Sequence, residues 1–411
     1  MAEHELKFID LCCGIGGFHQ ALIKMGMKCV MAADIDKYCR ENYELNYGIR
    51  PEGDFTKIDA SDIPAFDVLC AGFPCQPFSK AGAQSGFGDQ RGNIFFDICR
   101  IVKHHKPKYL VLENVRNLAT HDKGNTWSVI RRKIDELGYH TYDDPVIVNT
   151  LYFGVPQSRE RVVIMCKRKD MGEMEELPTF TKKSCDLASI IESTCDPKYN
   201  ITGKLSVTHD VWDEFIHILN DNGISVPKFP LWTDWWDSDG DNTSVTKYDK
   251  KKTDEENQEL VTAAQHAFYG KYTNWIDKNR EFFEQNNAIL APWLEKSRKQ
   301  PLWAGAVRKM EWQTGRDNVD MSQVLWSPRG SGVRIKNTDY SPTLVAMASM
   351  IPIYGPKKRQ LTPRECARLQ SFPETYKIHE TDKIAYKQFG NAVNVTMIEK
   401  CARFLIFNEK P

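Results

Sequence analysis

A cysteine and a glutamate follow two separate apolar runs, and both residue types take part in covalent or acid–base chemistry. Cys75 lies in a loop between two prolines, shortly after the run Val68–Ala71. The prolines exclude a helix and stiffen the loop, so a positioned thiol there is a candidate nucleophile. The alternative is that Cys75 is one more small apolar side chain, the usual state of a free cysteine. Glu113 ends the run that begins at Tyr109, which places a carboxylate at a second strand end.

A glycine-rich turn near the start of the chain suits the binding of a ligand. Lys7–Leu11 predicts a buried strand, and two cysteines and the sequence Gly-Ile-Gly-Gly follow it before a predicted helix from about Phe18. Such a turn lets a ligand approach backbone amides at the start of a helix. A second predicted strand, Cys29–Ala33, ends at Asp34, where an acid commonly accepts hydrogen bonds from ribose hydroxyls. The pattern favours a mononucleoside cofactor, with a plain strand–helix–strand unit as the alternative.

Alternating strands and helices are predicted through residue 167, and they must position these groups. This alternation predicts an α/β fold with a doubly wound, mostly parallel, Rossmann-like sheet. Ligands bind such sheets at the carboxyl ends of the strands. The glycine turn, Asp34, Cys75 and Glu113 all fall at that edge, and their convergence is stronger evidence than any one of them.

Length and composition bound the class of protein. A chain of 411 residues with 41% hydrophobic and 27% charged residues suits a globular protein with one large domain and a smaller one. No apolar run reaches the roughly 18 residues of a membrane span. The 12 cysteines include no Cys-x-x-Cys pair, which indicates a reducing, intracellular protein without structural zinc. A net charge of zero neither indicates nor excludes nucleic acid.

The alternation of predicted strands and helices ends near residue 170, and regular elements are predicted again from Thr362. The middle of the chain is rich in tryptophan, and Glu255–Arg298 includes a predicted helical insertion. The basic, glycine-bearing segment Pro328–Arg334 suits insertion into a groove, with a flexible basic loop as the alternative. Thr362 and Glu365 then predict a helix with a capping box, and an amphipathic helix closes the chain at about Phe407.

The motifs, taken in order, resemble those of the cytosine-5 DNA methyltransferases over nearly the whole chain. The matching segments are Phe8–Leu11 with Gly14, Gly16 and Gly17, then Gly72–Pro77, Glu113–Val115, Gln157–Arg161, Arg364–Gln370 and Gly390–Val393. The sequence departs from the family pattern in two places, the cofactor loop and the ribose-binding acid. Cys12 and Cys13 replace a frequent Phe-Ala, and Asp34 replaces the usual glutamate.

The resemblance implies a set of site residues and a cofactor. The implied catalytic residues are Cys75, Glu113, Arg159 and Arg161. The implied cofactor-binding residues are Gly14, Ile15, Gly17, Asp34, Ile35, Asp54, Phe55, Pro74 and Asn391. The implied cofactor is S-adenosylmethionine, which leaves as S-adenosylhomocysteine, and no metal is expected.

The resemblance also implies the reaction and the domain organisation. The enzyme would transfer a methyl group to carbon 5 of a flipped-out cytosine in a short duplex DNA sequence, through an adduct between Cys75 and carbon 6. Residues 1–174 would form the catalytic and cofactor-binding domain, residues 175–340 the target-recognition domain, and residues 341–411 the late motifs with a returning C-terminal helix. The chain resembles a stand-alone enzyme of a restriction-modification system. Such an enzyme would be a cytoplasmic monomer that binds double-stranded DNA and does not bind a membrane.

Three other functions fit these motifs less well. The RNA-methylating branch of the family usually carries a Cys-Phe-Thr string and a Pro-Pro-Cys loop, and this chain has neither. A DNA-binding protein with an inactive catalytic fold would not need an intact Cys75, Glu113 and Arg161. A nucleotide-dependent oxidoreductase would leave both the cysteine loop and the Glu-Asn-Val strand end without a purpose.

Overall fold

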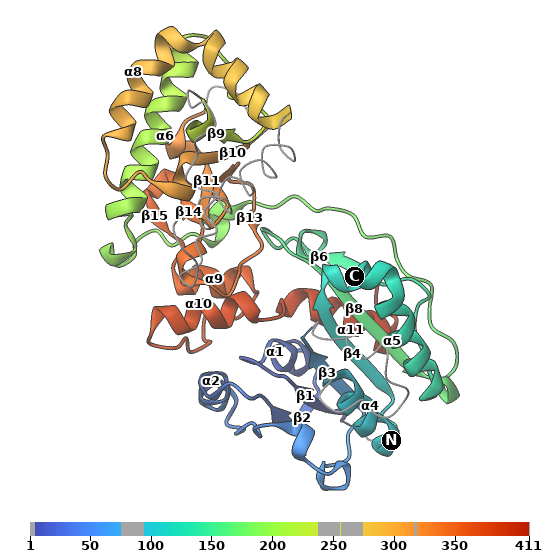
Figure 1. Cartoon of the computed structure of the whole chain (residues 1–411). Helices are drawn as coiled ribbons and strands as arrows, with labels where there is room; N and C mark the ends of the chain where they lie inside the picture. Colours follow the sequence, from blue (N-terminus) through green and yellow to red (C-terminus); the bar gives the residue numbers. More distant parts are fainter. Residues whose placement is uncertain (1–4, 75–93, 237–254, 256–273, 316–318, 411) are drawn as a thin grey trace. The chain divides into compact units, whose positions relative to one another are not determined.

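The computed structural model describes residues 5–74, 94–236, 255, 274–315 and 319–410. The chain forms two compact units (Figure 1). The first unit comprises residues 1–192, 339–348 and 362–411, and the second comprises residues 193–338 and 349–361. The chain therefore passes between the units four times, and three separate segments build the first unit.

A seven-stranded sheet forms the centre of the first unit, with the order β2-β1-β3-β4-β8-β5 and β6 paired with β8. Its parallel strands are β1 (Lys7–Leu11), β2 (Lys28–Ala33), β3 (Val68–Gly72) and β4 (Tyr109–Val115). Its antiparallel part consists of β8 (Glu160–Arg168), β5 (Tyr139–His140) and β6 (Ile147–Asn149). The predicted α/β fold is confirmed, with β8 as the antiparallel strand beside β4.

Helices cover both faces of this sheet because alternate strand residues point to opposite sides. On one face, Leu11, Leu69 and Leu112 share an apolar core with the helices α4 (Ile94–His105) and α5 (Asn125–Glu136). On the other face, α11 (Val395–Phe407) packs against α1 (Gly17–Ile23), β4 and β8 (Figure 1). The remaining α-helices among the described residues of the unit are α2 (Lys37–Tyr47), α9 (Pro363–Leu369) and α10 (Asp382–Asn391).

Local sequence rules fix the start of α9. The Thr362 hydroxyl accepts a hydrogen bond from the Glu365 amide, and the Glu365 carboxylate accepts one from the Thr362 amide at 2.8 Å. Pro363 occupies the first turn, where its missing N–H costs nothing. The predicted capping box is confirmed.

A small parallel sheet joins distant parts of the first unit. It consists of β7 (Gln157–Ser158) and β13 (Ser341–Pro342). The Ser341 amide also donates to the Pro156 carbonyl at 2.8 Å. This pairing ties residues 339–348, which the second unit flanks on both sides in the sequence, to the segment that precedes β8.

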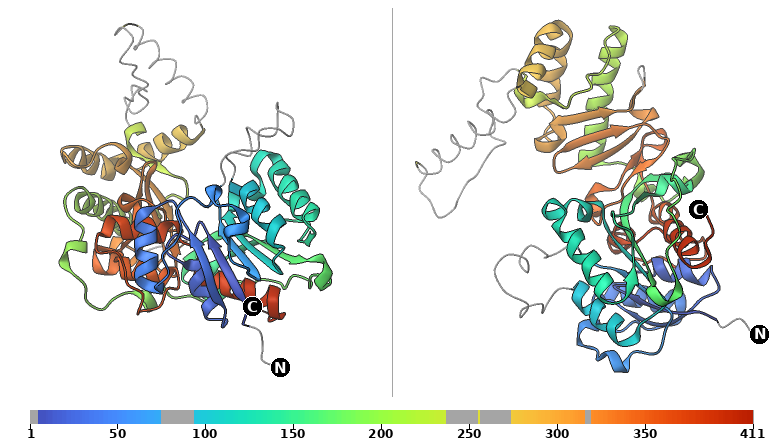
Figure 2. Two further views of the ribbon diagram at one scale, coloured as in Figure 1. Left: turned by 90° about the horizontal axis from the view of Figure 1, so that it is seen from below. Right: turned by 90° about the vertical axis from the view of Figure 1, so that its right-hand side faces the viewer.

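The second unit is a six-stranded sheet with helices on one face (Figure 2). The strands are β15 (Arg359–Gln360), β14 (Ile353–Tyr354), β11 (Leu325–Arg329), β12 (Gly332–Lys336), β10 (Lys309–Gln313) and β9 (Leu231–Trp232), in spatial order. The helices α6 (Gly203–Asp221) and α8 (Asn287–Arg298) share a tryptophan-rich core with this sheet. The predicted insertion is helical over residues 274–285 and 287–298, while residues 256–273 lie outside the described part.

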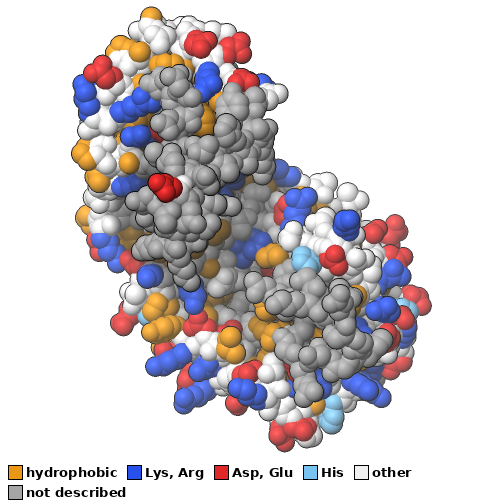
Figure 3. Space-filling model, viewed as in Figure 1, with side chains coloured by type: hydrophobic (Ala, Val, Ile, Leu, Met, Phe, Trp, Pro, Cys, Tyr) orange, Lys and Arg blue, Asp and Glu red, His pale blue; other side chains and the backbone are white. Residues whose placement is uncertain are grey.

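On the face of the molecule drawn in Figure 3, positive and negative side chains of the described residues are interspersed, as the zero net charge of the chain suggests. Among the described helices, none has both the length and the apolar character needed to cross a membrane.

Candidate active site

The glycine turn after β1 is held against the end of β2. Gly14 and Gly16 have φ angles of 52° and 83°, in the left-handed region that glycine adopts without strain. The Gly14 amide donates to Asp34 Oδ2 at 2.8 Å, and the Asp36 amide donates to Asp34 Oδ1 at 2.8 Å. The Tyr376 hydroxyl donates to the Ile15 carbonyl at 2.9 Å and so supports the turn from below. The structure thus brings Gly14, Ile15 and Asp34 together.

This turn has the features of a nucleoside site. Ile35 leaves 78% of its surface exposed directly after Asp34, which is unusual for a large apolar side chain. An added Cβ on Gly14 would meet no atom within 4 Å, so the space beside the turn is open. Burial raises the pKa of the Asp34 carboxyl, although both of its oxygens accept backbone hydrogen bonds. An open turn, an acid and an exposed apolar side chain fit the nucleoside of the implied cofactor.

Four parts of the sequence converge where β1, β3 and β4 end. A Cβ on Gly17 would lie 2.5 Å from Val393 Cγ2 and 2.8 Å from the Val393 carbonyl oxygen, so only glycine permits this contact. A Cβ on Gly72 would lie 3.7 Å from atoms of Glu113, Phe18 and Val393. The cofactor turn, the cysteine strand, the acidic strand end and the late motif therefore share one location.

Glu113 and Arg161 form a buried ion pair at this location. Arg161 Nε lies 2.7 Å from Glu113 Oε1, and each side chain is only 11% exposed. The antiparallel register places Arg161 opposite Val115, so both charged groups lie on the α1–α11 face. Arg161 also donates from Nη1 to the Glu160 carbonyl at 2.8 Å, which fixes the guanidinium. A short charge-assisted bond between two enclosed groups makes a rigid polar site.

The backbone that leads into the cysteine loop is anchored by Asn114. Its buried amide donates from Nδ2 to the Phe73 carbonyl at 2.8 Å. Phe73 is buried, with its ring centroid 5.7 Å from that of Phe95. Pro74, the next residue, is exposed, and Cys75 lies outside the described residues. Sequence reasoning gave Asn114 no role, although its place directly after Glu113 at the strand end was the available signal.

Arg159 lies apart from the Glu113–Arg161 pair in its contacts. It is 1% exposed. Its Nη1 donates to the Leu344 carbonyl at 3.1 Å, and its Nη2 donates to the Gly390 and Ala392 carbonyls at 3.1 and 2.8 Å. Burial lowers the pKa of Arg159 to about 9. The structure thus surrounds this guanidinium with backbone carbonyls.

Asp54, Phe55 and Asn391 occupy three different settings. Asp54 Oδ1 accepts from the Thr56 hydroxyl at 2.7 Å, which holds the pKa of Asp54 below its usual value. Its Oδ2 lies 3.3 Å from Lys57 Nζ, so this carboxylate serves its own turn. Phe55 is buried in the α4–α5 core, whereas Asn391 is exposed at the end of α10.

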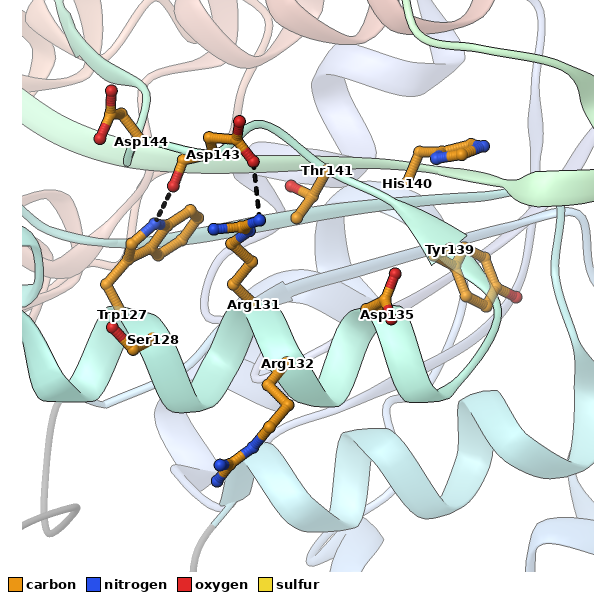
Figure 4. Close-up of a pocket in the computed structure, with 10 residues that line it drawn as sticks. All are labelled: Trp127, Ser128, Arg131, Arg132, Asp135, Tyr139, His140, Thr141, Asp143 and Asp144. Atoms are coloured by element: carbon orange, nitrogen blue, oxygen red, sulfur yellow. Dashed lines mark hydrogen bonds and ion pairs between the residues drawn. The ribbon is translucent and has the colours of Figure 1, made fainter.

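A groove of about 670 Å³ lies elsewhere in the first unit, between α5 and the start of β5 (Figure 4). Two polar contacts join residues of the lining, whereas Asp135 pairs with Lys169 outside it, at 2.7 Å. Arg131 Nη2 lies 2.8 Å from Asp143 Oδ1, and Trp127 Nε1 donates to the Asp143 carbonyl at 2.7 Å. No predicted site residue lines this groove.

The fold and the polar strand ends define a Rossmann-like methyltransferase. The family model for C-5 cytosine-specific DNA methylases matches residues 6–406. The chain is 33% identical over 398 residues to the Type II methyltransferase M.HhaI of Haemophilus parahaemolyticus, covering 97% of this chain and 93% of that protein. It is also 33% identical over 441 residues to the Type II methyltransferase M.BanI of Aneurinibacillus aneurinilyticus, covering 98% and 96%.

Structural comparison agrees with this at the level of the fold. The S. pombe Dnmt2 methyltransferase matches with a TM-score of 0.52 and 18% identity, covering 98% of this chain and 99% of that one. The chain belongs to the C-5 cytosine-specific DNA methylase family and is a DNA (cytosine-5-)-methyltransferase. The family resemblance predicted from the sequence is confirmed.

Proposed function

We propose that the enzyme methylates carbon 5 of a cytosine that has left the stack of a short duplex DNA sequence, with S-adenosylmethionine as methyl donor. The observation that carries this proposal is the buried Glu113–Arg161 pair beside the strand end that leads to Cys75. The similarity to Type II methyltransferases supports a role as the modification enzyme of a restriction-modification system. We further propose that the enzyme is an intracellular monomer and that residues 175–340 read the DNA bases.

The residues around the glycine turn suit the donor. The open space beside Gly14 would receive it, Asp34 would accept from its ribose hydroxyls, and Ile35 would cover one face of its base. Asn391, exposed two residues before the Val393 contact with Gly17, would line the same space. When bound, S-adenosylmethionine supplies an electrophilic methyl group.

The chain's own residues make the cytosine reactive. The Cys75 thiolate forms a bond to carbon 6, and the electron pair of the 5,6 double bond moves toward carbon 5 and the ring. Glu113 shares a proton with ring nitrogen 3, and Arg161 donates to the base carbonyl, so both stabilise the developing charge. After carbon 5 has taken the methyl group, loss of its proton restores the double bond and expels the thiolate.

The DNA duplex makes base extrusion necessary. Stacking covers carbon 6 on both faces of the base pair, so a thiolate cannot approach it within the helix. The rigid Glu113–Arg161 pair offers a donor and an acceptor to the edge of an extruded base, which offsets part of the cost of unstacking.

The test is to incubate the enzyme with duplex DNA of mixed sequence and labelled S-adenosylmethionine, and to map 5-methylcytosine at base resolution. We expect one short recurring site. The Cys75→Ser variant should transfer no methyl group yet retain DNA binding, whereas the control Cys195→Ser, a half-buried cysteine of the second unit, should behave as wild type. Label in RNA alone, or normal turnover by Cys75→Ser, would contradict the proposal.

A further inference from the structure

The segment Gln157–Arg161 is a junction for distant parts of the first unit. The Gln157 side chain donates to the Leu369 carbonyl at 2.9 Å and accepts from the Leu344 amide at 3.0 Å. The Thr343 hydroxyl donates to the Ser158 carbonyl at 2.7 Å. These bonds join residues more than 180 positions apart in the sequence. The segment therefore holds the late part of the chain in place.

Arg159 extends this junction to the predicted cofactor residue Asn391. Its Nη2 donates to the carbonyls of Gly390 and Ala392, which flank Asn391 on both sides. Gly390 is also pressed against the backbone, because an added Cβ would lie 2.4 Å from the Val345 carbonyl carbon. Arg159 thus holds the peptide group that precedes Asn391 and the one that joins Ala392 to Val393.

The same contacts leave Arg159 with little to offer a substrate base. Both of its Nη atoms donate to carbonyls, and only Nε has no partner among the described residues. A guanidinium that is 1% exposed cannot be reached by a base unless the surrounding backbone opens. Arg161, two residues later, is the arginine that contacts Glu113.

We propose that Arg159 is a positioning residue, which holds Asn391 and Val393 against the glycine turn and so sets the affinity for the cofactor. Arg161, in contrast, donates to the substrate base. This inference rests on the proposed function. It divides the two arginines of one short motif between the two sites, so the segment that places Arg161 beside Glu113 also holds one wall of the cofactor site.

The first test is titration calorimetry with S-adenosylhomocysteine in the absence of DNA. Arg159→Met should weaken binding by about tenfold or more, because it removes hydrogen bonds from a charged donor, and Arg159→Lys should recover part of the loss. Arg161→Met should bind within about threefold of wild type but lose the single-turnover rate at saturating cofactor. The control Arg131→Met removes a half-exposed ion pair with Asp143 and should change neither quantity.

A double-mutant cycle keeps the test decisive if Arg159→Met does not fold. If Arg159 acts through Asn391, then Arg159→Lys and Asn391→Ala should each weaken binding, and the double variant should be little weaker than Asn391→Ala alone. Additive losses, or wild-type affinity in Arg159→Lys with a reduced single-turnover rate, would overturn the inference alone. A wild-type enzyme that does not bind S-adenosylhomocysteine would overturn the proposed function and the inference with it.

Discussion

The two units differ in the balance of the side chains that they bury, although each buries both polar groups and aromatic rings. The first unit buries charged and amide groups at the ends of its strands, with Asp10, Glu113, Asn114 and Arg159 all less than 10% exposed. The second unit buries aromatic rings, and its sheet places the ion pair of Arg334 and Glu311, 2.8 Å apart, on adjacent strands. Buried polar groups cost stability unless they are satisfied, whereas buried rings contribute to it. The buried polar groups of the first unit therefore indicate a functional site with a fixed geometry. The aromatic core of the second unit indicates a stable structural support.

In the tryptophan core of the second unit, two indole N–H groups reach backbone acceptors, whereas those of Trp303 and Trp326 have no hydrogen-bond partner among the described residues. Trp212 is fully buried, with its ring centroid 5.4 Å from Phe215 and 6.0 Å from Trp303. Its Nε1 donates to the Val307 carbonyl at 2.8 Å, and Trp293 Nε1 donates to the Val211 carbonyl at 3.2 Å. Large rings fill the space between α6, α8 and the sheet while these indole N–H groups reach backbone acceptors.

The largest expected effect concerns the stability of the second unit, whose core is built from aromatic rings. Trp212→Ala should lower the free energy of unfolding of the second unit by about 3–5 kcal/mol, because it leaves a cavity and an unpaired Val307 carbonyl. Denaturant unfolding followed by tryptophan fluorescence measures this. The half-buried Trp275→Ala is the control and should cost less. A loss below about 1 kcal/mol for Trp212→Ala would show that the core is not organised around this ring.

The next largest expected effect concerns the rate of methyl transfer and the buried Glu113 of the first unit. Glu113→Gln should slow single-turnover methyl transfer by on the order of a hundredfold or more, the scale of a lost acid–base group. The measurement uses saturating DNA and S-adenosylmethionine, so that binding does not limit the rate. Glu160→Gln is the matched control, since Glu160 precedes Arg161 but forms a half-exposed pair with Arg116 at 3.2 Å. An unchanged rate in Glu113→Gln would remove this residue from the mechanism.

The smallest effect concerns a polar group that the first unit buries at a cost. Asp10 is fully buried, and burial raises its pKa well above the usual range, against a smaller lowering by the His19 backbone N–H. Its carboxylate oxygens have no hydrogen bond of normal length in the described part of the chain. Because the folded state binds this proton more tightly, stability falls as pH rises from the ordinary aspartate pKa to the raised one. Asp10→Asn should therefore gain about 1 kcal/mol at neutral pH and nothing at low pH.

The control variant, Asp59→Asn, should change the stability with the opposite dependence on pH. Asp59 is exposed, and hydrogen bonds from Ser61 lower its pKa, so its contribution is present at neutral pH and is lost as pH falls. Unfolding measured from acid to neutral pH should separate the two trends. If Asp10→Asn destabilises the protein at neutral pH, then Asp10 meets a donor in solution and belongs with the satisfied polar groups.

Features that depend on neighbouring residues could be predicted from the sequence. The capping box of Thr362 and Glu365 and the turn at Gly14 and Gly16 depend on spacings of a few residues, where backbone geometry leaves few solutions. The gathering of Asp34 and Glu113 at one sheet edge followed from the alternation of strands and helices. These are cases in which local physics and topology agree.

Features that depend on distant contacts could not be predicted. The acceptors of Arg159 lie 185, 231 and 233 residues away, so no local pattern distinguishes its buried position from that of Arg161. The antiparallel direction of β8 is likewise set by its path back along β4 and not by its composition. By contrast, the Asp54 carboxylate caps the turn at Thr56, a local contact that its Asp-x-Thr spacing could have indicated, and its role toward the cofactor stays a prediction.

The three-segment construction of the first unit has a consequence for its biosynthesis. Residues 1–192 leave the ribosome before the second unit, but α10 and α11 come from residues 362–411. At synthesis rates of about 5–20 residues per second, the nascent sheet waits on the order of ten seconds or more for the helix that covers its α1 face. Until residues 362–411 have been made, Gly17 has no Val393 beside it and Arg159 lacks two of its three acceptors, the carbonyls of Gly390 and Ala392. The contact between the glycine turn and Val393 therefore forms only when residues 362–411 dock on the sheet, late in synthesis.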